Sequence, residues 1–339
     1  MAARIINQVT GQTQRLPPLP TIRDLIRLYK LRALKQFSQN FLMDQRLTDK
    51  IVRAAGNIEN SYVLEIGPGP GSITRSILGR YPKHLVVVEK DRRFLPSLEI
   101  LADSTKDFVK MDIIRDDILK FQCQNAFPDC QPRGWQEKRA NVHLIGNLPF
   151  AISTRLLINW LKDISLKRGA WNYGRASLTL TFQHEVAQRM IAGIGDDQRC
   201  RLSVMSQIWT STDLKFTIPG DAFVPKPKVD VGVVTLIPWK EPLTKLPFDL
   251  VEKVMRHIFS MRQKYVRRGI ANLYPEKDQE ELTARTFDIA EVDPHARSFE
   301  LSNEECLRIA DAYQKILEEH PTYAAYNYRA PQRELDNFM

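Results

Sequence analysis

Seven apolar stretches of strand length follow one another over the first 240 residues of the chain. They are rich in β-branched residues and bounded by turn-forming residues, which is typical of buried strands. Helical patterns separate most of the first five, so those strands are expected to be parallel and joined by right-handed crossovers. The last two lie ten residues apart, which allows a hairpin and one antiparallel strand. The stretches cover residues 61–66, 84–89, 110–115, 141–146, 177–182, 212–218 and 229–237.

This pattern predicts the α/β class, with a doubly wound, seven-stranded, Rossmann-like sheet. After Pro238 the pattern changes, and a linker with two prolines leads into helical periodicity from Phe248 to about Leu317. A small helical domain is therefore expected to follow the sheet. In chain order we expect an N-terminal arm, an α/β domain, a helical domain and a tail, at residues 1–35, 36–239, 240–320 and 321–339.

The N-terminal arm is basic and contains several prolines. Its first 23 residues hold three arginines and no acidic residue, which is compatible with a mitochondrial presequence. Pro17, Pro18 and Pro20 would interrupt an amphipathic helix, so a disordered terminus fits the composition equally well. Thr21, with Asp24 three residues later, resembles a capping box and predicts a helix start after the prolines.

Composition indicates a globular protein with a polyanionic partner. Of the 339 residues, 43% are hydrophobic and 26% charged, which excludes a disordered chain. No apolar run approaches the roughly 20 residues that a membrane span requires, so no membrane partner is expected. The net charge of +9 suits a nucleic acid.

The cysteines and histidines give no sign of a metal site. No pair of cysteines has C-x-x-C spacing, and the six histidines are scattered. We interpret the cysteines as reduced structural thiols of an intracellular protein. They are Cys123, Cys130, Cys200 and Cys306.

Three of the first strands end in residues suited to an adenosine-containing ligand. Gly67 and Gly69 form a turn before a helical pattern, so a ligand can approach the backbone and the free N–H groups there. Glu89, followed by Lys90, can accept hydrogen bonds from ribose hydroxyls. At the third strand end, Asp117 can accept from an adenine amino group while Ile118 packs on the ring. Carboxyl ends of parallel strands share one edge of the sheet, where ligands bind.

The fourth strand leads into Asn147, Leu148, Pro149 and Phe150. The exocyclic nitrogen of adenine is a poor nucleophile because its lone pair is delocalised into the ring. A carboxamide oxygen and a main-chain carbonyl, held rigid by proline, can accept both N–H hydrogens and so favour a pyramidal nitrogen. The aromatic residue offers a face for the base. The motif is thus suited to amino-group methylation, although Asn and Pro also form ordinary turns.

At this point the chain resembles the ribosomal RNA adenine dimethyltransferases, which use S-adenosylmethionine. Residues 16–23 and 182–187 are similar to the mitochondrial branch of that family, whose members are also described as transcription factors. Two departures stand out: Phe150 replaces a frequent Tyr, which leaves stacking intact, and Val231 replaces a frequent Ser. The motifs that carry the resemblance are in the family's order, at residues 39–44, 65–71, 88–91, 146–150 and 223–230.

The resemblance implies S-adenosylmethionine as cofactor and dimethylation of adenine N6 in small-subunit ribosomal RNA, free or in an assembling small subunit. It also implies the mitochondrial matrix and, as a further partner, the mitochondrial transcription machinery. We expect Gln39, Asn40 and Leu42 to close over the cofactor. Phe150 and Phe223 would hold the target base between them, since unpaired RNA bases stack on aromatic rings.

Two other functions fit parts of the pattern. A transcription accessory that binds nucleic acid without chemistry would have no need of Gly67, Glu89, Asp117 and Asn147 together. A DNA adenine methyltransferase more usually has Pro where Leu148 stands, and a separate target-recognition domain. Six Lys or Arg residues and no acid between positions 253 and 268 predict either an RNA-binding stripe or a solvated basic face.

Overall fold

The computed structural model describes residues 5–6, 13–14, 21, 24 and 40–330. These residues divide into two compact units. Of the described residues, those up to 187 and 211–240 form the first, here called the sheet unit, and residues 188–210 and 241–330 form the second, the helical unit. Most of the expected N-terminal helix lies outside the described residues, but the N–H of Asp24 donates to Thr21 Oγ1 at 3.2 Å.

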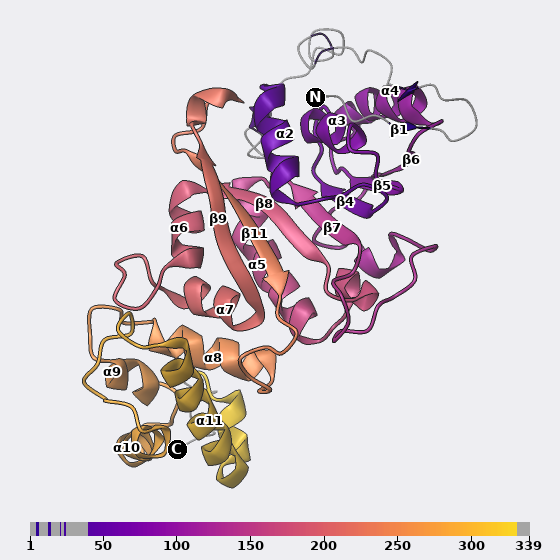
Figure 1. Ribbon diagram of the computed structural model, residues 1–339. Coiled ribbons are helices and arrows are strands. Elements are labelled where there is room, and N and C mark those ends of the chain that lie inside the picture. Colours follow the sequence, from indigo (N-terminus) through magenta and orange to yellow (C-terminus); the bar gives the residue numbers. More distant parts are fainter. Residues whose placement is uncertain (1–4, 7–12, 15–20, 22–23, 25–39, 331–339) are drawn as a thin grey trace. The chain divides into compact units, whose positions relative to one another are not determined.

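The sheet unit contains a seven-stranded sheet (Figure 1). Its spatial order is β6-β5-β4-β7-β8-β11-β9, so β4 lies between β5 and β7. The chain therefore builds outward from β4 to β6 and then returns to β7 on the other side. The strands are β4 (Tyr62–Ile66), β5 (His84–Val88), β6 (Lys110–Ile114), β7 (Val142–Gly146), β8 (Ser177–Gln183), β9 (Thr210–Ile218) and β11 (Val231–Pro238).

The pairing confirms the predicted fold. β4 runs parallel to β5 and β7, β5 to β6, and β7 to β8, whereas β11 pairs antiparallel with β8. All seven predicted stretches are strands, with ends shifted by at most two residues. β4 and β5 are buried along their whole length, including Glu65 and His84 within their otherwise mostly apolar sequences.

Short strands and helices complete the described part of the sheet unit. β3 (Phe41–Leu42) pairs antiparallel with β10 (Phe223–Val224), and β1 (Ile5–Ile6) with β2 (Thr13–Gln14). The helix α2 packs against α3, α4 against β6 and α5 against β8. The α-helices are α2 (Gln45–Ala54), α3 (Ser72–Leu78), α4 (Leu95–Thr105), α5 (Phe150–Ser165) and α6 (His184–Ile191), the last of which continues into the helical unit after Ala187, and the 3-10 helices are η2 (Arg92–Phe94), η3 (Cys123–Asn125), η4 (Gly169–Tyr173) and η5 (Gly220–Ala222).

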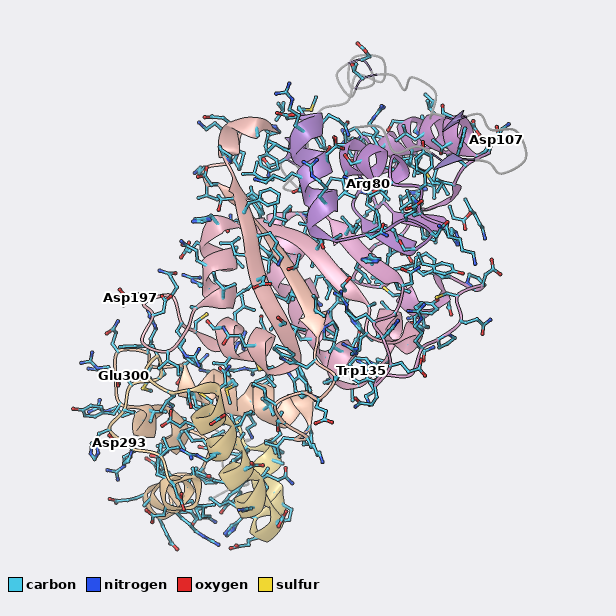
Figure 2. All side chains as sticks on the ribbon, in the orientation of Figure 1. Arg80, Asp107, Trp135, Asp197, Asp293 and Glu300 are labelled. Atoms are coloured by element: carbon cyan, nitrogen blue, oxygen red, sulfur yellow. The ribbon has the colours of Figure 1, made fainter. Side chains whose placement is uncertain are left out.

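The helical unit joins two separate stretches of the chain. Its buried Arg199 donates to the carbonyls of Ala192 and Leu301 and to Asn303 Oδ1, at 2.9–3.1 Å. In Figure 2, Asp197 and Glu300 mark two neighbouring loops of this unit, which the bond from Gly195 N to Phe299 O, 2.8 Å, ties together. The helices are α7 (Arg201–Trp209), α8 (Phe248–Ile258), α9 (Val266–Ala271), α10 (Gln279–Ala290), α11 (Asn303–Glu319) and η6 (Pro321–Ala325).

The helical unit also takes in residues 188–210, which precede the expected start of the helical domain at residue 240, because α7 packs against α8 and α11. The basic stretch 253–268 is not one helical stripe, since α8 ends at Ile258 and α9 begins at Val266. Within it, Lys253 is half-buried and donates to the carbonyls of Tyr323 and Ala324. Among the described residues, no helix is long and apolar enough to cross a bilayer.

Gly71, the N-cap of α3, provides a test of the sheet unit's packing. Its φ is +90°, and a Cβ there would lie 2.6 Å from Leu101 Cδ1, which is fully buried. Gly56 has the same φ but open space around its Cβ position. We expect Gly56→Ala to lower the free energy of unfolding by about 1 kcal/mol and Gly71→Ala by about 1–3 kcal/mol more. Equal losses of unfolding free energy in the two variants, measured by urea unfolding, would show that the Leu101 side chain can move aside without an energetic cost.

Candidate functional site

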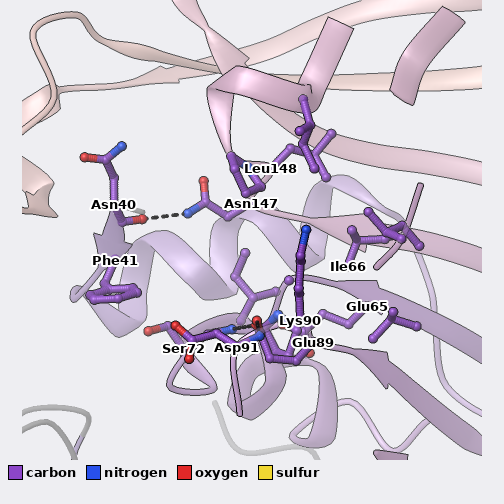
Figure 3. Close-up of a pocket in the computed structure, with 18 of the residues that line it drawn as sticks. Asn40, Phe41, Glu65, Ile66, Ser72, Glu89, Lys90, Asp91, Asn147 and Leu148 are labelled. Atoms are coloured by element: carbon purple, nitrogen blue, oxygen red, sulfur yellow. Dashed lines mark hydrogen bonds between the residues drawn. The ribbon is translucent and has the colours of Figure 1, made fainter. Parts of the chain in front are cut away.

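A cavity of about 290 Å³ lies at the carboxyl ends of β4, β5, β6 and β7 (Figure 3). This is the edge where the strand order reverses on either side of β4, the position at which open α/β sheets bind ligands. Most of the predicted site residues line it. They are Asn40, Leu42, Gly67, Gly69, Glu89, Lys90, Asp117, Ile118, Asn147, Leu148, Pro149 and Phe150.

The glycine turn forms one wall of the cavity. Gly67 and Gly69 have φ values of +60° and +55°, in the left-handed region that glycine tolerates best. The N–H of Gly69 donates to Glu89 Oε2 at 3.0 Å. This bond ties the turn after β4 to the end of β5.

Glu89 is buried, with 6% of its surface exposed. Its Oε1 accepts from the N–H of Asp91 at 2.7 Å, so both carboxylate oxygens accept from the main chain. Burial raises the pKa of Glu89 above its ordinary value, while these main-chain bonds oppose the rise. Each oxygen retains a second lone pair for a hydroxyl donor.

Asp117 lies at the end of β6 and is held from two sides. Its Oδ2 accepts from Lys90 Nζ at 2.9 Å, and its Oδ1 from the N–H of Leu119 at 3.1 Å. The bond to Lys90 lowers the pKa of Asp117, so its carboxylate stays ionised. Ile118, 9% exposed, lines the cavity beside it.

The side-chain amide of Asn147 is fixed at both ends. Its Nδ2 donates to the carbonyl of Asn40 at 2.9 Å (Figure 3), and its Oδ1 accepts from Thr181 Oγ1 at 2.7 Å. Thr181 stands opposite Asn147 because Gly146 pairs with Leu180 in the parallel register of β7 and β8. The carboxamide is thereby oriented with Oδ1 keeping one free lone pair.

The two predicted aromatic faces have different positions. Phe150, the first residue of α5, is half-buried and lines the cavity. Phe223 does not line the cavity. Its side chain is 2% exposed and packs in the hydrophobic core with Leu42, the residue of β3 with which it pairs in β10. These contacts are those of loop packing, and the stacking role expected for Phe223 stays a prediction. Gln39 lies outside the described residues.

Sequence reasoning missed several residues of the site. Thr181 orients Asn147, and Phe41 lines the cavity with its ring against Phe94, centroids 5.4 Å apart. Glu65, 1% exposed, also lines it, and its Oε2 has no hydrogen-bond partner within the described chain. Burial raises the pKa of Glu65 to about 8. An acid inside the apolar run Tyr62–Ile66 was the available signal for this residue.

Comparison with known proteins identifies the family. Residues 30–315 match the family model described as ribosomal RNA adenine dimethylase. The chain belongs to the ribosomal RNA adenine dimethylase family. It is 58% identical to Dimethyladenosine transferase 1, mitochondrial, of Drosophila melanogaster, over 96% of this chain and 97% of the relative. With the human protein of the same name it shares 51% identity, over 94% and 91%.

Solved structures show the same fold. A dimethyladenosine transferase from Plasmodium falciparum aligns with a TM-score of 0.64 at 22% identity, over 81% of this chain and 98% of that chain. The 23S rRNA methyltransferase ErmE aligns with a TM-score of 0.56 at 22% identity, over 81% and 100%. Membership of the rRNA adenine dimethylase family makes the protein a methyltransferase, and relatives named mitochondrial agree with the mitochondrial branch.

The buried acid of this dimethylase makes its stability depend on pH. Since the pKa of Glu65 is about 8 instead of 4.5, the folded state keeps a proton that the unfolded state releases, and stability falls between these pH values. Glu65→Gln should remove this fall, so that its free energy of unfolding exceeds that of the parent protein by up to about 4 kcal/mol at pH 8. Urea unfolding at pH 5 and pH 8 measures this difference in the free energy of unfolding, and Glu59→Gln, at an exposed position, is the control. A constant difference between parent and Glu65→Gln would contradict the raised pKa.

Proposed function

We propose that the protein transfers methyl groups from S-adenosylmethionine to N6 of adenine in mitochondrial small-subunit ribosomal RNA, in two successive steps that give dimethyladenosine. It would act in the matrix, on the RNA or on the assembling small subunit. The observation that carries this proposal is the doubly fixed amide of Asn147 beside a cavity that also holds Glu89 and Asp117. A scaffold that only binds nucleic acid does not require such a combination.

The cavity fits S-adenosylmethionine. Two polar side-chain atoms that line it, Glu65 Oε2 and Ser72 Oγ, are buried without a partner in the described chain. Such atoms are costly unless a ligand completes their hydrogen bonds. The carboxyl of Glu65 would accept from the ammonium of the cofactor's methionine part, whose positive charge would lower the raised pKa of Glu65, and Ser72 Oγ would donate to the adjacent carboxylate. Gly67 and Gly69 leave room for the ligand's close approach to the backbone.

The other end of the cavity would hold the cofactor's adenosine. Glu89 would accept the ribose hydroxyls through its remaining lone pairs, because Gly69 and Asp91 fix its carboxylate in place. Asp117 would accept from the adenine amino group, with Ile118 against the ring. Lys90 keeps Asp117 ionised and therefore a strong acceptor. The carbonyl of Asn40 and the side chain of Leu42 would close the N-terminal side.

Methyl transfer then depends on how the chain holds the target adenine. The cofactor supplies an electrophilic methyl group on a sulfonium. Asn147 Oδ1 and the carbonyl of Leu148 or Pro149 would accept the two N6 hydrogens, directing the nitrogen lone pair toward that methyl. Positioning of this kind can contribute about 7–11 kcal/mol. No strong base is needed, since the cationic product nitrogen can lose its proton to water.

Phe150 would provide a face for the base. It begins α5 directly after Pro149, whose ring stiffens the backbone that presents it. A base stacked on an aromatic ring gains about 1–3 kcal/mol. The target must be unpaired or turned out of its stack to reach this position, which favours a loop of structured RNA.

Methyl incorporation from labelled S-adenosylmethionine tests the proposal directly. We expect the wild-type chain to methylate small-subunit ribosomal RNA and not duplex DNA, and Asn147→Ala to lose at least about a hundredfold in rate while still binding the cofactor in calorimetry. Incorporation into DNA alone would identify a DNA enzyme. Nucleic-acid binding without any incorporation would leave the non-catalytic transcription factor, and full activity of Asn147→Ala would remove Asn147 from the mechanism.

The hydroxyl of Thr181 gives a second prediction. Thr181→Val keeps the shape of the side chain but removes the bond to Asn147 Oδ1. The rate of methyl transfer should fall about tenfold, the value of roughly one hydrogen bond, with an unchanged dissociation constant for the cofactor. Thr179→Val makes the same change two residues earlier on the same strand and should leave the rate nearly unchanged. Equal effects of both variants would contradict the positioning role.

A further inference from the structure

The helical unit has a cavity of its own, about 360 Å³ in volume. It lies between the first residue of α7, the last turn of α8 and the segment after η6. Its polar lining comprises Arg201, Arg256, His257, Ser260, Asn327, Tyr328 and Arg329. None of these residues takes part in the cofactor cavity described above.

The lining is strongly positive. Arg201 Nη1 and Arg256 Nη2 contact the two oxygens of one carboxylate, that of Glu252, at 2.9 and 2.6 Å. Three arginines against one glutamate leave two positive charges in excess around the cavity. Arginine presents several donors in a planar fork that matches phosphate, so an anion with several oxygens fits this lining.

His257 adds a second and independent requirement. It is 7% exposed, and its Nδ1 lies 2.8 Å from the carbonyl oxygen of Lys253. Because a carbonyl can only accept, Nδ1 carries the proton, and in the neutral ring Nε2 is an acceptor. This buried Nε2 has no hydrogen-bond partner within the described chain, although its residue lines the cavity.

The neutral ring is the one expected at physiological pH. Burial lowers the pKa of His257 below its ordinary value, and the charges of Lys253, Arg256 and Arg329 act in the same direction. The bond to the Lys253 carbonyl opposes them. The ligand must therefore offer negative charge to the arginines and, within the same small space, a hydrogen-bond donor to His257.

A ribonucleotide meets both requirements, since its 2′-hydroxyl and its 3′-phosphate are carried on neighbouring ribose carbons. A phosphodiester of DNA supplies the charge but no donor. We propose that this cavity binds one ribose-phosphate unit of the RNA substrate, with Arg201 and Arg256 on the phosphate and His257 Nε2 accepting the 2′-hydroxyl. The assignment rests on the proposed RNA substrate, and it gives the helical unit a contact that distinguishes RNA from DNA.

The phosphate contact is tested with the full-length chain and a fluorescent stem–loop RNA that carries unpaired adenines in its loop. Anisotropy titrations should show about tenfold weaker binding for Arg201→Gln and Arg256→Gln, and a smaller dependence on salt. Arg308→Gln removes an equal charge from an exposed position of the same unit that does not line the cavity, and should change affinity less than twofold. Equal losses in all three variants would overturn the proposal, because net charge alone would then explain them.

The hydroxyl contact is tested by replacing single nucleotides of the same stem–loop with their 2′-deoxy forms. For the wild-type chain, one position should weaken binding about threefold to tenfold, and at that position His257→Leu should show no further loss. Deoxy effects that are the same in both proteins would overturn the assignment of His257. If His257→Leu does not fold, the wild-type scan still decides, because a scan without any sensitive position contradicts the contact.

Failure of this proposal differs from failure of the proposed function. A chain that methylates ribosomal RNA while its cavity variants bind normally refutes only the ribose-phosphate site. A chain that binds RNA through Arg201 and Arg256 but incorporates no methyl group refutes only the enzymatic proposal.

Discussion

The site depends on how one carboxamide is immobilised. Asn147 donates to the Asn40 carbonyl and accepts from the Thr181 hydroxyl, so its orientation is set by a segment before the sheet and by the neighbouring strand. Asn40 precedes β3, which β10 holds in an antiparallel pair. Three regions far apart in the sequence thus converge on a single amide, and its free oxygen lone pair is positioned before any ligand arrives.

The doubly wound sheet explains why one cavity can serve two ligands. Because β4 lies between β5 and β7, the residues after β5 and β6 lie on one side of the turn after β4 and those after β7 on the other. The acids Glu89 and Asp117 thereby line the part suited to an adenosine, while Asn147 and Phe150 line the part suited to a target base. Under the proposed function the chemistry would require no mobile catalytic group, only a target base held in line with the methyl group of the donor.

Much of this arrangement could be predicted from the sequence, because it follows from local patterns. The apolar runs predicted the seven strands, and the residues directly after β4, β5, β6 and β7 line the cavity because the carboxyl ends of parallel strands share one edge of the sheet. Contacts across the fold could not be predicted in this way. Thr181 lies inside a strand, and nothing in the neighbouring sequence indicates its bond to Asn147. Phe223 packs in the core beside Leu42, with which it pairs. Residues 188–210 join the helical unit because α7 packs against α8 and α11.

The composite origin of the helical unit limits how the molecule can be divided. A fragment that began at Glu241 would lack α7 and the guanidinium of Arg199, which ties the two stretches of that unit together. The faces of α8 and α11 that α7 covers would then meet water. Transplanting this unit into another protein would accordingly require both stretches of the chain to be moved together.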